Sequence, residues 1–285
     1  MFRKLLKYDM KSVWKVWRIM AVILLGLSVV GSFVLRYILE NFDKMLYSTP
    51  LSMMFSLFML TAFMSILAAY VITIVFVFLR FYKNFFTDEG YLTFTLPVTR
   101  GTLLRSKTVN AIIWMALLFV LYLVCAIPFA VISPPTDNGE LFNPCVFEFI
   151  GEMFEGIWES FGAWTVVYAV EAILFCVISV FYSIATFQLC ITVGSILVKK
   201  AKVLLGIGIY YGFSMVTSTV SMVLRIVFFL TLSEGFSELL ARATENEIAW
   251  VFALGIMVVC MAMVAFALII HSVTRMCIER KLNLA

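Results

Sequence analysis

Side chains that catalyse reactions in other proteins are few in this sequence and lie far apart. His271 is the only histidine, and the six cysteines are dispersed instead of being paired at the spacing of metal ligands. The sequence contains no G-x-x-x-x-G-K-S/T phosphate cradle, no H-E-x-x-H zinc motif and no G-x-S-x-G nucleophile turn. We therefore expect no catalytic residue, no metal site, no cofactor and no ATP hydrolysis by this chain itself.

Two charged side chains interrupt long apolar runs and are candidates for chemistry inside a membrane. Glu171 follows Trp164 by seven residues, and Arg225 precedes Leu232 by seven. At about 1.5 Å per residue, both would lie roughly 10 Å below the outer surface. An ionised side chain is costly in hydrocarbon, so we expect the two to form a salt bridge. The alternatives are a pair that only fixes helix packing, separate snorkelling to the interface, and a substrate or proton site.

The elements that carry these residues follow from the composition. The chain has 285 residues, of which 64% are hydrophobic and 13% charged, and its mean hydropathy is +1.07. A soluble domain is about a quarter charged, whereas a membrane helix needs roughly 20 mainly apolar residues. Six runs fit the second pattern: 19–35, 51–79, 111–132, 163–198, 203–232 and 248–270. We expect an all-α polytopic membrane protein with six transmembrane helices.

The distribution of basic residues predicts the orientation of these helices. Lysine and arginine gather in the N-terminal segment, in the loop 80–107, in the turn 199–202 and after His271. The other three loops contain only Arg36, Lys44 and Arg242, and most of the acidic residues. Short loops rich in lysine and arginine stay on the cytoplasmic side. Both termini are therefore predicted to be cytoplasmic, in a multi-pass protein of the cell membrane.

Residues 1–18 have the pattern of an amphipathic helix. One helical stripe is apolar (Leu6, Met10, Val13, Trp14 and Trp17), and a separate stripe is basic (Lys4, Lys7, Lys11, Lys15 and Arg18). This pattern predicts a helix that lies at the bilayer surface, with the lipid bilayer as its partner. The alternative is a simple topology anchor.

Two further segments favour helix formation or packing. The segment 133–162 is acidic and is expected outside the cell, where Phe147, Ile150, Phe154 and Ile157 at near-helical spacing predict an amphipathic helix. Gly208 and Gly212 form a G-x-x-x-G motif that would allow another helix to approach closely.

The loop 80–107 mixes threonines, acids, a proline and basic residues. Asp88 or Thr87 can cap a short helix that places Leu92 and Leu96 on one face and ends at Pro97. Thr99 can cap a second helix that continues into the third span. The sequence therefore predicts a short helix, exposed to the cytoplasm and joined by a turn to a membrane helix.

The sequences DEGYL and TLPVTR in this loop resemble the cytoplasmic loop of bacterial ABC-2 type transporter permeases. The resemblance implies a single permease domain over residues 1–285, whose coupling helix docks on a separate ABC ATPase subunit. It also implies a second permease subunit, identical or paralogous, and no nucleic acid. Carried over residue by residue, the candidate coupling residues are Asp88, Glu89, Gly90, Tyr91, Leu92, Leu96 and Pro97. One departure is the acidic SEGFSELLARATENE stretch, which stands where many such permeases have re-entrant helices and is expected to lie on the outer surface.

We expect the chain to export a substrate with energy from ATP hydrolysed on the partner subunit. The alternative is a non-transporting membrane sensor or assembly protein whose loop docks a signalling partner. An intramembrane hydrolase has almost no support from the residues. The apolar spans would suit peptides, lipids or drugs alike, so the sequence does not identify the substrate.

Overall fold

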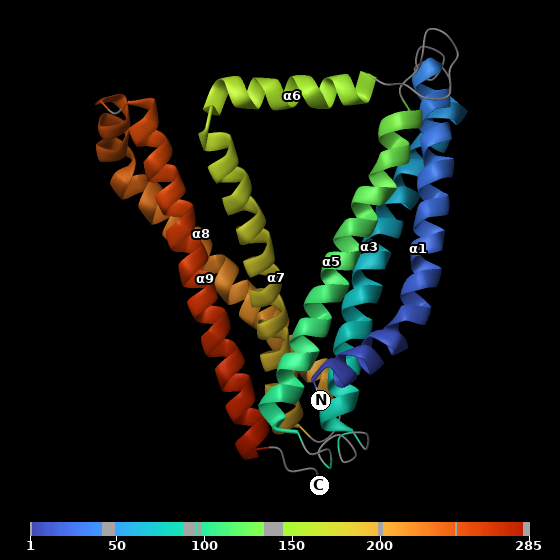
Figure 1. Cartoon of the computed structure of the whole chain (residues 1–285), viewed down its shortest axis with the longest axis vertical. Helices are drawn as coiled ribbons and strands as arrows, with labels where there is room; N and C mark the ends of the chain where they lie inside the picture. The colour runs from blue at the N-terminus through green and yellow to red at the C-terminus, as the bar shows by residue number, and fades with distance from the viewer. Residues whose placement is uncertain are drawn as a thin grey trace. The chain divides into compact units, whose positions relative to one another are not determined.

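The computed structural model in Figure 1 describes residues 2–41, 49–87, 90, 95, 98–133, 145–198, 202–242 and 244–281. This part of the chain consists of helices and connections, without a strand, which confirms the all-α prediction. The helices are α1 (Phe2–Glu40), α3 (Thr49–Phe86), α5 (Arg100–Ile132), α6 (Cys145–Phe161), α7 (Trp164–Leu197), α8 (Lys202–Arg242) and α9 (Glu245–Lys281).

Six of these helices, all except α6, are long and apolar enough to cross a membrane, as the hydropathy pattern predicts. All of them except α7 extend beyond the apolar run predicted for them. The basic N-terminal segment and the first span are thus one helix, α1. The acidic stretch after residue 232 continues α8 to Arg242, and its location on the outer surface stays a prediction. Because α9 begins at Glu245, re-entrant helices do not fit between α8 and α9.

Contacts group the chain into two compact units. The first contains residues 1–80 and 109–160, and the second contains residues 81–108 and 161–285. The last residues of α3 and the first residues of α5 therefore belong to the second unit, together with the loop between them. The orientation of the termini relative to a membrane, and the single permease domain over residues 1–285, stay predictions.

In the first unit, α1, α3 and α5 lie side by side (Figure 1). A cluster of buried residues joins them: Met20, Ala21, Leu24, Ala69, Leu118 and Leu121. Tyr122 donates a hydrogen bond to the Ile66 carbonyl at 2.8 Å, and Ser28 donates one to the Cys125 carbonyl. Gly31 lets the rings of Phe58 and Phe129 approach, because a Cβ there would lie within 3 Å of both. Polar bonds and close packing thus hold three apolar helices in one arrangement.

Helix α6 confirms the helix predicted within 133–162, over residues 145–161. Gly162 ends it with a φ of +53°, a left-handed conformation that glycine adopts without steric cost. Phe154 and Ile150 are exposed on this helix. Residues 134–144 lie outside the described residues, and the location of the segment outside the cell stays a prediction.

In the second unit, α7 packs against both α8 and α9. At one end of α7, Trp164 donates from Nε1 to Asn246 Oδ1 at 3.2 Å and stacks edge-on against Trp250. At its other end, a Cβ on Gly194 would lie 2.7 Å from the Gly206 backbone nitrogen. The close approach of helices therefore occurs at Gly194 and Gly206. No helix packs on Gly208 or Gly212 within the described chain, since a Cβ at either would contact nothing within 4 Å, and close approach at this motif stays a prediction.

These two glycine environments predict opposite effects of the same substitution. Gly194→Ala forces backbone against backbone, so we expect it to lower the free energy of unfolding by about 1–3 kcal/mol. Gly208→Ala is the matched control, and it should be neutral or stabilising by up to about 1 kcal/mol because alanine favours helix. Thermal unfolding of the purified proteins in detergent measures both. Equal midpoints for the two variants would contradict the close packing of α7 on α8.

Candidate functional site

The coupling residues suggested by the resemblance are only partly placed by the structure. Asp88, Glu89, Tyr91, Leu92, Leu96 and Pro97 lie outside the described residues. Gly90 is described and buried, and its N–H donates to the Thr87 carbonyl at 2.7 Å. A Cβ on Gly90 would lie 3.1 Å from the Phe85 carbonyl oxygen, so the residue packs closely on the end of α3.

Thr87 directly follows Phe86, the last residue of α3. Its hydroxyl donates to the Lys83 carbonyl at 2.6 Å, one turn back along α3. The cap predicted at Thr87 stays a prediction, because a cap uses the hydroxyl oxygen as an acceptor and this bond uses the hydroxyl as a donor. The other predicted cap, Asp88, lies outside the described residues.

The last two turns of α3 form an aromatic foot made of Phe81, Phe85 and Phe86. All three are buried, and Phe85 is fully buried. The ring centroids of Phe81 and Phe85 are 5.0 Å apart, and those of Phe85 and Phe86 are 6.2 Å apart. Such pairs add about 0.5–1.5 kcal/mol beyond the area that they bury. The sequence analysis missed this foot, although the four-residue spacing of Phe81 and Phe85 was the signal for it.

The prediction that Thr99 caps the helix after the loop is confirmed. Its Oγ1 accepts a hydrogen bond from the backbone N–H of Thr102 at 3.3 Å and lies 2.8 Å from Thr102 Oγ1. Helix α5 begins at the next residue, Arg100. Because the first N–H groups of a helix have no partner within it, this bond fixes where the loop ends and α5 begins.

The first turns of α5 are buried among the helices of the second unit. Leu103 and Leu104 are almost completely buried, as is Thr108. The hydroxyl of Thr108 bonds Gln188 Oε1 at 3.0 Å, which ties α5 to α7. Gln188 is 2% exposed, and a polar side chain buried this deeply is costly without a partner. The sequence analysis missed Gln188, because one amide within an apolar run does not reveal its partner.

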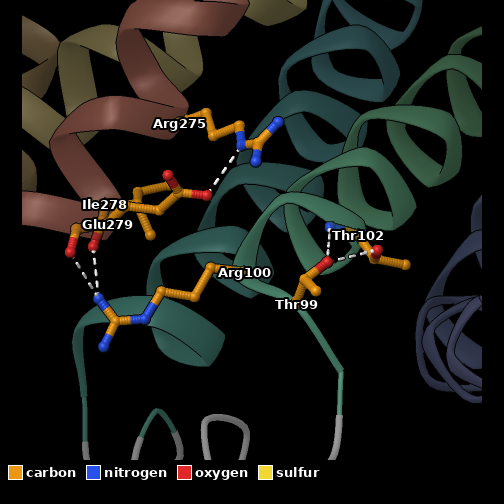
Figure 2. A network of polar contacts seen from close by, with 6 residues as sticks. All are labelled: Thr99, Arg100, Thr102, Arg275, Ile278 and Glu279. Carbon is orange, nitrogen blue, oxygen red and sulfur yellow. Dashed lines mark hydrogen bonds and ion pairs between the residues drawn. The ribbon is translucent and has the colours of Figure 1, made fainter.

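A second connection joins the start of α5 to the end of α9 (Figure 2). Arg100 Nη1 donates to the Ile278 carbonyl at 2.9 Å and to the Glu279 carbonyl at 3.1 Å. Both carbonyls belong to the last turn of α9, where acceptors lack helical partners and carry partial negative charge. Beside this contact, Arg275 bonds Glu279 at 2.8 Å.

Gly101 lets the two helices meet at this contact. A Cβ on Gly101 would lie 3.0 Å from Arg275 Nε, tighter than side chains normally pack. Ile278 and Thr274, on the same stretch of α9, are also buried. The base of α5 thus holds two neighbours, α7 through Thr108 and α9 through Arg100. A force applied to the loop before Thr99 would reach both helices through these contacts.

Glu171 and Arg225 are described to different extents. Glu171 is 7% exposed on α7, and its Oε2 atom has no hydrogen-bond partner among the described residues. Helix α8 contains Arg225, but the side chain of Arg225 lies outside the described part of the structure. The salt bridge between them stays a prediction, and the burial of Glu171 makes a partner necessary if its carboxyl is ionised.

A pocket of about 350 Å³ lies in the first unit between α1, α3 and α5. Its hydroxyl-bearing residues are Ser28, Thr61, Ser65 and Tyr122, and each donates its proton to a backbone carbonyl. The remaining wall is formed mainly by leucine, phenylalanine and alanine side chains. With its hydroxyl protons already engaged, the pocket offers mainly hydrocarbon contacts.

Among the described residues, no three histidine, cysteine, aspartate or glutamate side chains come together in a way that could hold a metal ion. His271 lies against the Phe181 ring, with centroids 6.3 Å apart. The five cysteines described with their side chains are all free thiols.

The Arg100 contact predicts how firmly the end of α9 is held. Arg100→Gln removes a charged donor from two carbonyls, which we expect to weaken the last turn of α9 by about 1 kcal/mol at this half-exposed position. Amide hydrogen exchange in residues 272–281 should become roughly fivefold faster. The control is Arg280→Gln, which removes an equal charge from α9 itself. Unchanged exchange in Arg100→Gln would contradict the role of this contact.

The charge pair has a direct genetic test. Reversing either Glu171 or Arg225 alone would bury two like charges, and we expect it to cost at least about 3 kcal/mol and most of the folded yield. The exchange Glu171→Arg with Arg225→Glu should recover part of that loss, because the attraction is restored. Size-exclusion chromatography after membrane extraction gives the folded yield. A double variant as poor as the sum of the single variants would refute the pairing.

Comparison of the chain with protein-family models, with curated proteins and with solved structures gives no match in any of the three. The similarity of the loop to ABC-2 type permeases therefore stays an expectation from the sequence. The structural grounds for a function are the six membrane-length helices, the cap at Thr99 and the contacts at the base of α5.

Proposed function

We propose that the chain is the membrane subunit of a bacterial ABC exporter of the ABC-2 type, located in the cell membrane. Its loop between α3 and α5 would dock on a separate ATPase subunit that hydrolyses ATP. A second permease subunit, either an identical chain or a paralogue, would complete the transport path. The chain itself would bind and move the substrate without catalysing a reaction.

The observation that carries this proposal is the construction of the base of α5. A loop that only connects two membrane spans needs no attachment to other helices. Here the residue after the loop, Arg100, holds the last turn of α9, and Thr108, two turns further on, holds α7. A docked partner that moves the loop would therefore move three helices together, as coupling of an ATPase to a transport path requires.

The beginning of the loop supports the same proposal. Gly90 packs on the Phe85 carbonyl, and the aromatic foot holds the end of α3 in the second unit. Buried aromatic packing resists deformation, because a shift of a few tenths of an ångström produces overlap. Both ends of the loop are thus firmly attached, which suits a lever that transmits force.

The exposed surface fits a membrane subunit with a further membrane partner. Large apolar side chains are exposed along α3, α7, α8 and α9, including Met54, Ile173, Met215 and Phe266. In a bilayer such side chains contact either lipid tails or another apolar protein surface. A second permease subunit would cover part of this surface and enclose a path between the two subunits.

The decisive experiment removes the two leucines of the predicted coupling helix. Leu92→Ala with Leu96→Ala should cost about 1–3 kcal/mol for each leucine that is an anchor, or several-fold to about a hundredfold in association. The measurements are co-purification of the ATPase subunit with the tagged chain and ATP hydrolysis by the complex. Membrane insertion should be unchanged, since neither leucine belongs to a span.

The matched control is Leu123→Ala with Leu254→Ala. Both leucines are exposed on membrane helices, where a water-soluble ATPase cannot reach them. Normal ATPase binding and hydrolysis in the Leu92 and Leu96 variant would refute the coupling assignment. If the unmodified chain co-purifies with no ATPase, the result favours a membrane sensor or assembly protein whose loop binds another partner.

A further inference from the structure

The N-terminal part of α1 presents a continuous line of positive charge. Lys4, Lys7, Lys11, Lys15 and Arg18 follow one another at intervals of three or four residues, and all five are exposed. At about 1.5 Å per residue, this basic stripe extends over roughly 20 Å of helix surface. It is much longer than a single ion would require.

The opposite side of this segment is fixed to the first unit. Val13 is 3% exposed, and the rings of Trp17 and Trp114 lie 5.7 Å apart between α1 and α5. Asp9 is buried and faces Arg80 of α3, with 3.7 Å between Oδ1 and Nε. These contacts set the rotation of α1 about its own axis. The basic stripe therefore cannot turn inward to find a partner.

The protein supplies no counter-charge to the basic stripe within its described residues. Asp9 is the only acid among the first 39 residues, and its carboxylate is directed to Arg80. None of the ion pairs found in the described residues includes a member of the stripe. The five cations thus remain available to a ligand from outside the chain.

The surroundings of the stripe identify the environment of that ligand. Trp14 is exposed beside the stripe, and Ile19, Val22 and Ile23 are exposed immediately after Arg18. Tryptophan favours the boundary between hydrocarbon and water, while exposed isoleucine and valine face lipid tails. Figure 1 shows that this part of α1 bends away from the axis of the rest of the helix. The basic stripe therefore meets the membrane at the depth of the phospholipid headgroups.

We propose that the basic stripe of α1 binds the headgroups of anionic phospholipids. The positive charge of the stripe is complementary to the negative charge of these headgroups. The stripe is continuous with the apolar exposed side of α1, and several headgroups can lie along its length. Lysine ammonium groups act as compact point charges without a fixed geometry, so selectivity should follow lipid charge and not headgroup shape. This inference goes beyond the transport proposal and does not depend on it.

The test uses the full-length protein in a neutral detergent. Phosphatidylglycerol or phosphatidylcholine is added, and native mass spectrometry measures the binding of each lipid. A lysine near an anionic membrane contributes roughly a fivefold gain in affinity, so three lysines contribute up to about a hundredfold. We expect Lys7→Gln with Lys11→Gln and Lys15→Gln to weaken phosphatidylglycerol binding at least tenfold and to leave phosphatidylcholine binding unchanged.

The matched control is Lys83→Gln with Arg105→Gln and Arg280→Gln. It removes the same charge from three exposed positions outside the stripe, and phosphatidylglycerol binding should stay near that of the unmodified protein. The charge-conserving variant Lys7→Arg with Lys11→Arg and Lys15→Arg should also bind normally. An equal loss in the control variant would show that net charge alone attracts the lipid, and it would overturn the proposal.

A measurement on the unmodified protein can overturn the proposal even if the glutamine variant fails to fold. The preference for phosphatidylglycerol over phosphatidylcholine should be clear at low salt and should largely disappear near 1 M salt, where charges are screened within about 3 Å. The absence of any preference at low salt would overturn the proposal, since the stripe is exposed in the native chain. Binding of an acidic protein with no lipid preference would assign the stripe to a protein partner instead.

Discussion

The absence of water in the bilayer interior is the constraint on which the other features of this structure depend. Each backbone N–H and C=O must find its partner within the chain, and a helix satisfies both locally. Serine and threonine follow the same rule, because Ser65 and Thr73 donate to carbonyls of their own helix. Tyr122 and Thr108 also reach neighbouring helices. These few bonds between helices determine which apolar surfaces pack together.

The contacts at the base of α5 follow from a related requirement, because the ends of a helix leave backbone groups without a partner in that helix. Carbonyls at the end of α9 have no N–H donor within that helix, and Arg100 supplies a charged donor to two of them. Gln188 is buried in α7 and finds Thr108. Satisfying these groups joins three helices at the point where the loop enters α5. The side chains that give these polar groups their hydrogen-bond partners are thus the same ones that connect the three helices.

The exterior shows two different ways of meeting a membrane. Along the spans, exposed apolar side chains suit lipid tails or another apolar surface, without direction or specificity. At the start of α1, a buried face held by Val13 and Asp9 leaves a basic face outside. Apolar contacts would set the depth of the spans in the membrane. Under our proposal, phospholipid headgroups also fix the position of the start of α1.

By itself the sequence determined the helical class, the six spans, the helix within 145–161 and the cap at Thr99, because hydropathy, helical spacing and capping are local properties. It did not single out Gly194 and Gly206, since the sequence does not reveal which face of a helix meets another. Only the tertiary structure placed Gly194 against Gly206, Thr108 against Gln188 and Arg100 on the last turn of α9. Those contacts join residues that are far apart in the chain, and their partners are decided by how complete helices pack.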